Sequence, residues 1–223
     1  MGGLIGELLP LALGVAVSPV PVGAAVLILL GDRPRNSALG FLVGWIVGIV
    51  VAVTVFTLLA ALIPQPDPDS PQPVIGVIKV ALGLLMLIGA VVLWRRRPHD
   101  GIPPAAPRWM QMMSRMNGVR GLVLGFVLAV LNPVDTLMAI AGGVLLGTTA
   151  TSTDQVVVGI IVFTLIGAST VAIPVVAYLV APTAMGTRLQ KLREWLVRYN
   201  STITIVLIIV VGFVLLGKGI GDF

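Results

Sequence analysis

The stretches that decide the fold are Ser18-Pro19-Val20-Pro21 and Asn132-Pro133-Val134-Asp135. Ser or Asn followed by Pro is typical of the start of a helix, where the two residues serve as N-cap and first helical residue. Here each pair lies near the middle of a long apolar run, where proline removes a backbone donor and clashes with the preceding turn. The sequence therefore predicts that two apolar helices are broken or kinked at Ser18-Pro19 and at Asn132-Pro133.

The composition around these pairs is that of a membrane protein. Of the 223 residues, 57% are hydrophobic and 10% are charged, and the mean hydropathy is +1.09. Long, nearly uncharged runs of this kind predict transmembrane helices. We expect an all-α polytopic protein with six of them: Leu8–Leu30, Ser37–Ile63, Pro73–Trp94, Val119–Leu146, Gln155–Val180 and Ser201–Gly217.

The basic residues predict the orientation of these helices. Most of the 14 lysines and arginines fall in the loops after the first, third and fifth predicted helices. By the positive-inside rule these loops are cytoplasmic, which places both termini outside. We therefore expect a multi-pass protein of the plasma (inner) membrane that contacts membrane lipids. The basic sequence pI, about 10.5, reflects this topology, and we expect no nucleic acid partner.

Three matching features predict a 3+3 inverted repeat. Ser18-Pro19 matches Asn132-Pro133, a pair of glycines eight residues apart recurs in the second and fifth predicted helices, and the sequence around Gly83 resembles that around Gly212. Three helices per repeat invert the second half relative to the first. The predicted domains are residues 1–94 as the first repeat, 95–118 as a basic cytoplasmic linker and 119–223 as the second repeat.

This repeat places the two helix starts at similar depth, with their N-termini facing each other. Free N–H groups and partial positive charge converge there, which favours an anionic group. Asp135 lies well inside a predicted span, where an ionisable residue indicates a functional site by default. Three roles stay open for it: binding a coupling proton or cation, gating access for an anionic substrate, or capping its own half-helix.

The candidate binding residues follow from this arrangement. The primary candidates are Ser18, Pro19, Pro21, Asn132, Pro133, Asp135 and Thr136, and the secondary candidates are Lys79, Thr164, Ser169 and Thr170. Lys79 either snorkels to the outer face or pairs with Asp135 or a substrate. The hydroxyls either line a path or bond across helices. The sequence has no Walker motif, catalytic constellation or metal-ligand spacing, so we expect no enzyme activity, no cofactor and no metal.

Several stretches resemble a known family. Ser18-Pro19-Val20-Pro21, the run Leu29–Arg35 and the run Ala38–Trp45 resemble the actinobacterial GAP family, in the lysine-exporter (LysE) superfamily. Its members are glycopeptidolipid and sulfolipid addressing proteins, and the resemblance covers essentially the whole chain. It implies a role in moving cell-envelope glycolipids, or lipid-linked precursors, to the outer side of the membrane.

The leading hypothesis is a small secondary transporter or flippase. It would carry an anionic glycolipid to the outer leaflet, with its head group passing the two half-helix N-termini and with Asp135 adjusting charge or coupling to protons. The first alternative is a LysE-type exporter of a small solute, either an amino acid or a cation. The second is an accessory scaffold that recruits a larger lipid exporter. A homodimer or a larger export complex would suit a chain of six helices.

Overall fold

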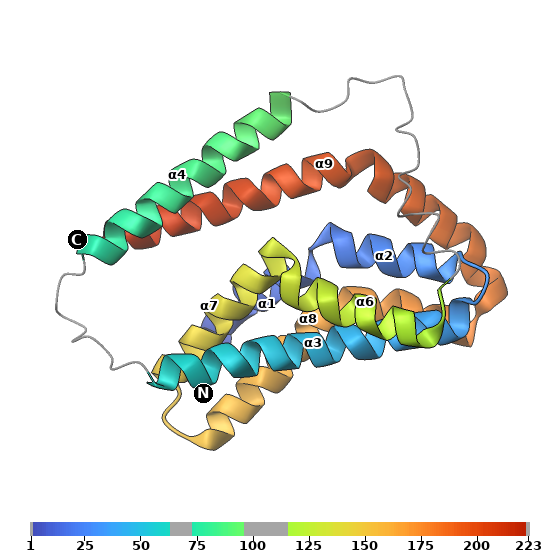
Figure 1. Ribbon diagram of the computed structural model, residues 1–223, viewed down its shortest axis with the longest axis horizontal. Helices are drawn as coiled ribbons and strands as arrows, with labels where there is room; N and C mark the ends of the chain where they lie inside the picture. The colour runs from blue at the N-terminus through green and yellow to red at the C-terminus, as the bar shows by residue number, and fades with distance from the viewer. Residues whose placement is uncertain (1, 63–72, 96–115, 222–223) are drawn as a thin grey trace. The chain divides into compact units, whose positions relative to one another are not determined.

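Helices make up all the regular structure in the described part of the chain (Figure 1). The structure is a computed structural model that describes residues 2–62, 73–95 and 116–221. Most of the predicted linker 95–118 lies outside the described residues. The helices are α1 (Gly2–Ala16), α2 (Pro19–Leu29), α3 (Pro34–Leu62), α4 (Pro73–Arg95), α6 (Gly118–Leu131), α7 (Pro133–Thr149), α8 (Thr153–Val180) and α9 (Pro182–Gly221).

Two of these helices, α3 and α8, are unbroken, apolar and long enough to cross a membrane. Two more crossings result if each bent pair, α1 with α2 and α6 with α7, counts as one span. Elsewhere in the described residues the apolar helical stretches are shorter, Gly83–Arg95 and Ile208–Gly221. The chain is therefore all-helical with two to four candidate spans in its described part, and the six-span 3+3 repeat stays a prediction.

Both helix breaks lie where the sequence predicts them. A bend of 47° separates α1 from α2, and a bend of 65° separates α6 from α7. The residue before a proline is driven out of the helical conformation by the proline ring. Ser18 has φ −56° and ψ 118°, and Asn132 has φ −69° and ψ 119°. The two breaks are therefore alike in backbone conformation as well as in sequence.

The helices belong to two compact units, each described here by itself. The first unit contains α1, α2, α3, α6, α7, α8 and the beginning of α9; the second contains α4 and the rest of α9. Each unit thus takes helices from both predicted repeats. The repeat boundaries at 1–94 and 119–223 stay a prediction, because the residues between 95 and 116 are outside the described part.

In the first unit, α3 and α6 lie side by side in parallel, with backbone touching backbone (Figure 1). A Cβ atom at Gly44 would collide with a backbone carbonyl of α6, and one at Gly125 would collide with a backbone carbonyl of α3. Glycines on both helices permit this approach. Further along, α3 packs on α7, where a Cβ at Gly143 would lie 2.9 Å from the carbonyl oxygen of Val53. We call this glycine-lined contact the α3 seam.

The corresponding contact between α8 and α1 is made through side chains. A Cβ atom at Gly167 would lie 3.2 Å from Cγ1 of Val15, and one at Gly159 would lie 3.3 Å from Cδ1 of Leu8. The two helices are also parallel. Each unbroken helix therefore packs on the broken helix of the other predicted repeat. Of these two contacts, the α3 seam is the one that brings backbones together.

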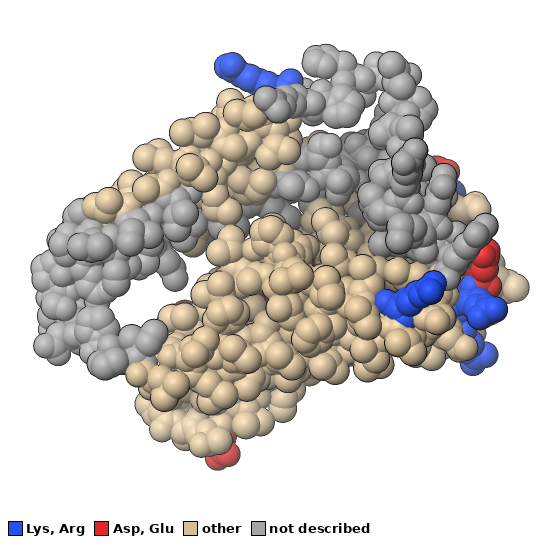
Figure 2. All heavy atoms as spheres, viewed as in Figure 1, with Lys and Arg blue, Asp and Glu red and all other residues tan. Residues whose placement is uncertain are grey.

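The outer surface of the first unit is apolar along its middle and basic where α3 and α6 begin (Figure 2). A stripe of exposed aliphatic side chains runs along α3, one on each turn: Val43, Val47, Val51 and Val55. Such an apolar band with charge at its end is typical of a helix bundle in a bilayer.

In the second unit, α4 and the C-terminal part of α9 pack antiparallel. A Cβ atom at Gly83 would lie 2.8 Å from the carbonyl oxygen of Gly212, and one at Gly219 would lie 2.9 Å from the carbonyl oxygen of Gly76. Gly83 and Gly212 are the residues that the sequence comparison matched, so the two similar stretches are also packing partners.

Candidate functional site

The two helix breaks meet through a short chain of hydrogen bonds. Nδ2 of Asn132 donates to Oγ of Ser18 at 3.2 Å, and Oγ of Ser18 donates to Oδ2 of Asp135 at 3.2 Å. These three side chains come from both breaks, and we call them the junction. The N-termini of α2 and α7 therefore adjoin, as the sequence predicts from topology alone.

The two helix starts are capped differently. Oδ1 of Asn132 accepts a hydrogen bond from the N–H of Val134 at 3.3 Å, so this residue caps its own helix α7. Ser18 occupies the N-cap position of α2 but makes no capping bond to it. Its hydroxyl is instead committed to Asp135. Ser18, which precedes α2, therefore bonds to the side chain of Asp135 in α7.

The start of α2 has few backbone donors to offer an anion. Pro19 and Pro21 lack N–H groups, so the first three residues of α2 carry a single one, that of Val20. On α7, Pro133 also lacks an N–H group, and the carboxyl of Asp135 lies in the first turn, where negative charge interacts favourably with the helix dipole. The protein's own carboxyl therefore occupies much of the position at which the sequence predicts an anionic group.

At each break, a threonine hydroxyl bonds to a backbone carbonyl that has lost its partner within the helix. Oγ1 of Thr136 donates to the carbonyl oxygens of Val130 at 2.6 Å and Asn132 at 2.8 Å. Oγ1 of Thr170, on α8, donates to the carbonyl oxygen of Ala16 at 2.6 Å. A buried carbonyl without a partner costs about 1–3 kcal/mol, so these bonds help to maintain both breaks.

Asp135 lies deep in the first unit with part of its hydrogen-bonding capacity unused. Its side chain is 1% exposed, as is that of Ser18. Within the described residues, Oδ1 of Asp135 has no hydrogen-bond partner. Buried carboxylate oxygens nearly always have one. This oxygen is therefore available to a proton, a cation or a donor group on a substrate.

The secondary candidates divide into those near the junction and those elsewhere. Thr170 reaches the α1–α2 break, as described above. Ser169 donates to the carbonyl oxygen of Ile166 in its own helix, at 2.6 Å. Thr164 is buried, and its Oγ1 has no partner in the part of the chain that the structure describes. The side chain of Lys79 is outside the described residues.

A close contact that the sequence did not predict lies beside the junction. A Cβ atom at Gly14 would lie 2.8 Å from Sδ of Met138, so α1 and α7 approach closely here. Gly14 comes one turn before Ser18, and Met138 comes one turn after Asp135. A glycine four residues before a predicted break was the available signal, because small residues allow helices to approach.

A family model described as "Sap, sulfolipid-1-addressing protein" (SfLAP) matches residues 8–221. The matched range includes both breaks, all three junction residues and most of the second unit. No curated protein matches the chain. No solved structure matches it either.

Proposed function

We propose, because the chain belongs to the sulfolipid-1-addressing protein family, that it is a membrane transporter or flippase for an anionic envelope glycolipid. In this proposal the cargo is a glycolipid or a lipid-linked precursor, moved from the inner to the outer leaflet of the plasma membrane. The protein performs no covalent chemistry on its cargo. The substrate class comes from the family description, and the mechanism comes from the junction.

The proposed mechanism rests on the geometry of the junction. Broken helices at corresponding places in two halves of a membrane protein are typical of transport sites. Here one buried hydroxyl, that of Ser18, is bonded to both Asn132 and Asp135. A change of hydrogen bonding at Asp135 therefore acts on the starts of α2 and α7 together.

Binding and release of a proton at Asp135 would change the hydrogen bonds of the junction. An ionised carboxylate only accepts hydrogen bonds, whereas the protonated group also donates one. Adding or removing a proton at Asp135 would change what Ser18 can donate to and what Oδ1 can offer a cargo. We therefore propose that proton exchange at Asp135 alters the angle between the half-helices and couples head-group movement to the proton gradient.

The test uses the full chain in proteoliposomes that contain a fluorescent sulfated glycolipid, with a phosphatidylcholine analogue as the neutral lipid. We expect the sulfated lipid to change leaflets at least about tenfold faster than in protein-free vesicles. Asp135→Asn should lower that rate about tenfold, because Asn keeps the shape but cannot exchange a proton. The matched control is Thr57→Val, which removes a buried hydroxyl bonded to the carbonyl of Val53 in its own helix.

Two results would contradict the proposal. If folded wild-type protein moves the sulfated lipid between leaflets no faster than protein-free vesicles do, the proposal of lipid transport is wrong. If Asp135→Asn moves the lipid as fast as the wild type does, the junction is not the transport site.

One observation favours a second candidate function, the export of a small cationic solute. Oδ1 of Asp135, which has no hydrogen-bond partner among the described residues, is a suitable partner for an ammonium or guanidinium group. Uptake of labelled lysine or arginine by the same proteoliposomes, without lipid movement, would support this exporter. If neither lipid nor solute moves and the chain copurifies with a larger lipid exporter, the accessory scaffold becomes the better explanation.

A further inference from the structure

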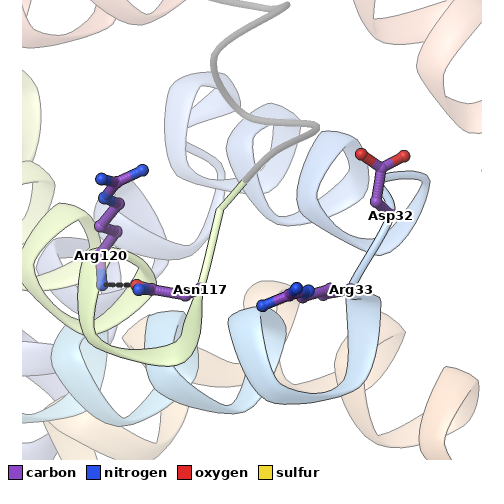
Figure 3. Close-up of a pocket in the computed structure, with 4 residues that line it drawn as sticks. All are labelled: Asp32, Arg33, Asn117 and Arg120. Atoms are coloured by element: carbon purple, nitrogen blue, oxygen red, sulfur yellow. Dashed lines mark hydrogen bonds between the residues drawn. The ribbon is translucent and has the colours of Figure 1, made fainter.

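A second polar feature lies at the end of the first unit where α3 and α6 begin. It is a cavity of about 330 Å³ lined by Asp32, Arg33, Asn117 and Arg120 (Figure 3). Arg33 comes from the turn between α2 and α3, and Arg120 comes from the first turn of α6. The volume is at the lower end of the range for small-molecule sites. We call it the arginine cavity.

The two guanidinium groups of the arginine cavity have no acidic partner among the residues that the structure describes. In the described part of the chain, no carboxylate lies within 4.0 Å of the guanidinium of Arg33 or Arg120. Asp32 lines the same cavity, but Figure 3 shows its carboxylate pointing away from Arg33. Guanidinium groups match the geometry of sulfate and phosphate esters, so two of them at one cavity suit the binding of such an ester.

The cavity has a fixed frame. Oγ of Ser37 donates to the carbonyl oxygen of Met116 at 2.7 Å, which ties the start of α3 to the residue before the N-cap of α6. Oδ1 of Asn117 accepts a hydrogen bond from the N–H of Arg120 at 2.9 Å, which fixes the first turn of α6 (Figure 3). Next to them, a Cβ atom at Gly40 would collide with the carbonyl of Gly118. The two arginines therefore stand on helix ends that cannot readily separate.

The position of the cavity suits a lipid head group. α3 is a candidate membrane span, and α6 begins another if the bent pair counts as one. Both start at the arginine cavity, and the apolar stripe of α3 begins about two turns further on. Charged residues at the ends of spans lie at the level of lipid head groups.

We infer that the arginine cavity binds the charged ester of an anionic lipid head group, a sulfate or a phosphate. The cavity lies at the basic end of the first unit. The inference rests on the proposed function and deepens it, because it assigns the place where the cargo docks before it reaches the junction. Arg33 and Arg120 hold the ester oxygens, and Asp32 weakens the binding of the anion.

The experiment measures binding to the full chain in neutral detergent micelles by calorimetry. The lipid arm uses dioctanoyl phosphatidic acid, and the free-ion arm uses inorganic phosphate and inorganic sulfate. We expect the lipid to bind at least about tenfold more tightly than either free ion, because its chains add apolar contacts. Arg33→Gln and Arg120→Gln should each weaken lipid binding about tenfold.

Two further variants distinguish a built site from diffuse positive charge. Arg35 lies at the same end of the unit but does not line the cavity, so Arg35→Gln should change the affinity less than about twofold. Asp32→Asn should strengthen binding about twofold to threefold, because it removes the nearby negative charge. All four substitutions are at exposed side chains, and unchanged thermal melting will show that the fold is retained.

Three outcomes would overturn the inference: equal losses in Arg35→Gln and Arg120→Gln, weaker binding in Asp32→Asn, or inorganic phosphate binding as tightly as the lipid. Its failure differs from failure of the proposed function. A chain that moves sulfated lipid but does not bind at the cavity loses only this inference. A chain that binds the lipid with the expected arginine dependence but moves none loses the transport proposal.

Discussion

The break between α1 and α2 and the break between α6 and α7 share the backbone conformation of the residue before proline and differ in chemistry. Ser18 and Asn132 adopt nearly the same conformation, and each precedes a proline that begins the next half-helix. At the third helical position, however, α2 has Pro21 and α7 has Asp135. The repeated pattern therefore fixes where the helices break, while the unmatched residue at the third position gives the two breaks different chemistry.

The surroundings of the two breaks differ in the same direction. The α6–α7 break is packed against α3 through the glycine-lined α3 seam, in which backbones touch. The α1–α2 break is packed against α8 through side chains such as Val15, which can repack. Packed backbones do not deform continuously, whereas side-chain contacts allow small sliding movements. We therefore expect α6–α7 to be the fixed partner and α1–α2 the moving one.

The largest expected effect is on the α3 seam. Gly44→Ala should destabilise the protein by about 3 kcal/mol, because the new methyl group collides with a backbone carbonyl of α6. Gly167→Ala, at the matching contact of α8, should cost less than about 1 kcal/mol, because only the side chain of Val15 must move. Thermal unfolding of the two variants in detergent measures the difference. Equal losses would end the distinction between a fixed and a moving break.

The next largest effect is expected at Thr170 and Thr136, whose hydroxyls bond to backbone carbonyls at the breaks. Thr170→Val should destabilise the protein by about 1–2 kcal/mol, because it leaves the carbonyl of Ala16 without its bond from α8. Thr136→Val should cost a similar amount, because it leaves the carbonyl of Val130 without its bond, although the carbonyl of Asn132 still accepts the backbone N–H of Thr136. Unfolding midpoints compare the two directly. A more damaging Thr136→Val would show that the α6–α7 break depends more on its hydroxyl.

The smallest expected effect distinguishes the two residues at the N-cap positions, Asn132 and Ser18. Asn132→Ala should destabilise the protein by about 1 kcal/mol, because α7 loses its N-cap. Ser18→Ala should cost α2 no cap at all, because Ser18 makes none. Its effect should appear instead in hydrogen–deuterium exchange around Asp135, at the start of α7. Faster exchange confined to α2 in Ser18→Ala would mean that Ser18 acts mainly on its own helix.

Much of this arrangement could be predicted from the sequence. Proline after Ser or Asn inside an apolar run determines a break by local sterics, and the positive-inside rule supplies the direction of each half-helix. These two inferences place Ser18 and Asp135 on facing helix starts. The positions of the breaks are confirmed, because local sterics depend only on neighbouring residues. The orientation inferred from the basic loops stays a prediction.

The rest depends on which surfaces meet, and a single sequence does not contain that. Glycines recur throughout the apolar helices, so nothing in their spacing shows that Gly44 and Gly125 line the same seam. The bond from Thr170 to the carbonyl of Ala16 joins residues 154 apart in the chain. The number of spans stays a prediction, because the described part of α4 and α9 has only short apolar stretches.

We expect the two breaks to act as one unit through the bond between Ser18 and Asp135. The most direct measurement is a double-mutant cycle on the rate of sulfated-lipid movement, with wild type, Ser18→Ala, Asp135→Asn and the double variant. We predict strong coupling, in which the double variant is about as slow as Asp135→Asn alone, because each substitution breaks the same link. Additive losses, with the double variant slower by the product of the two single effects, would contradict the claim.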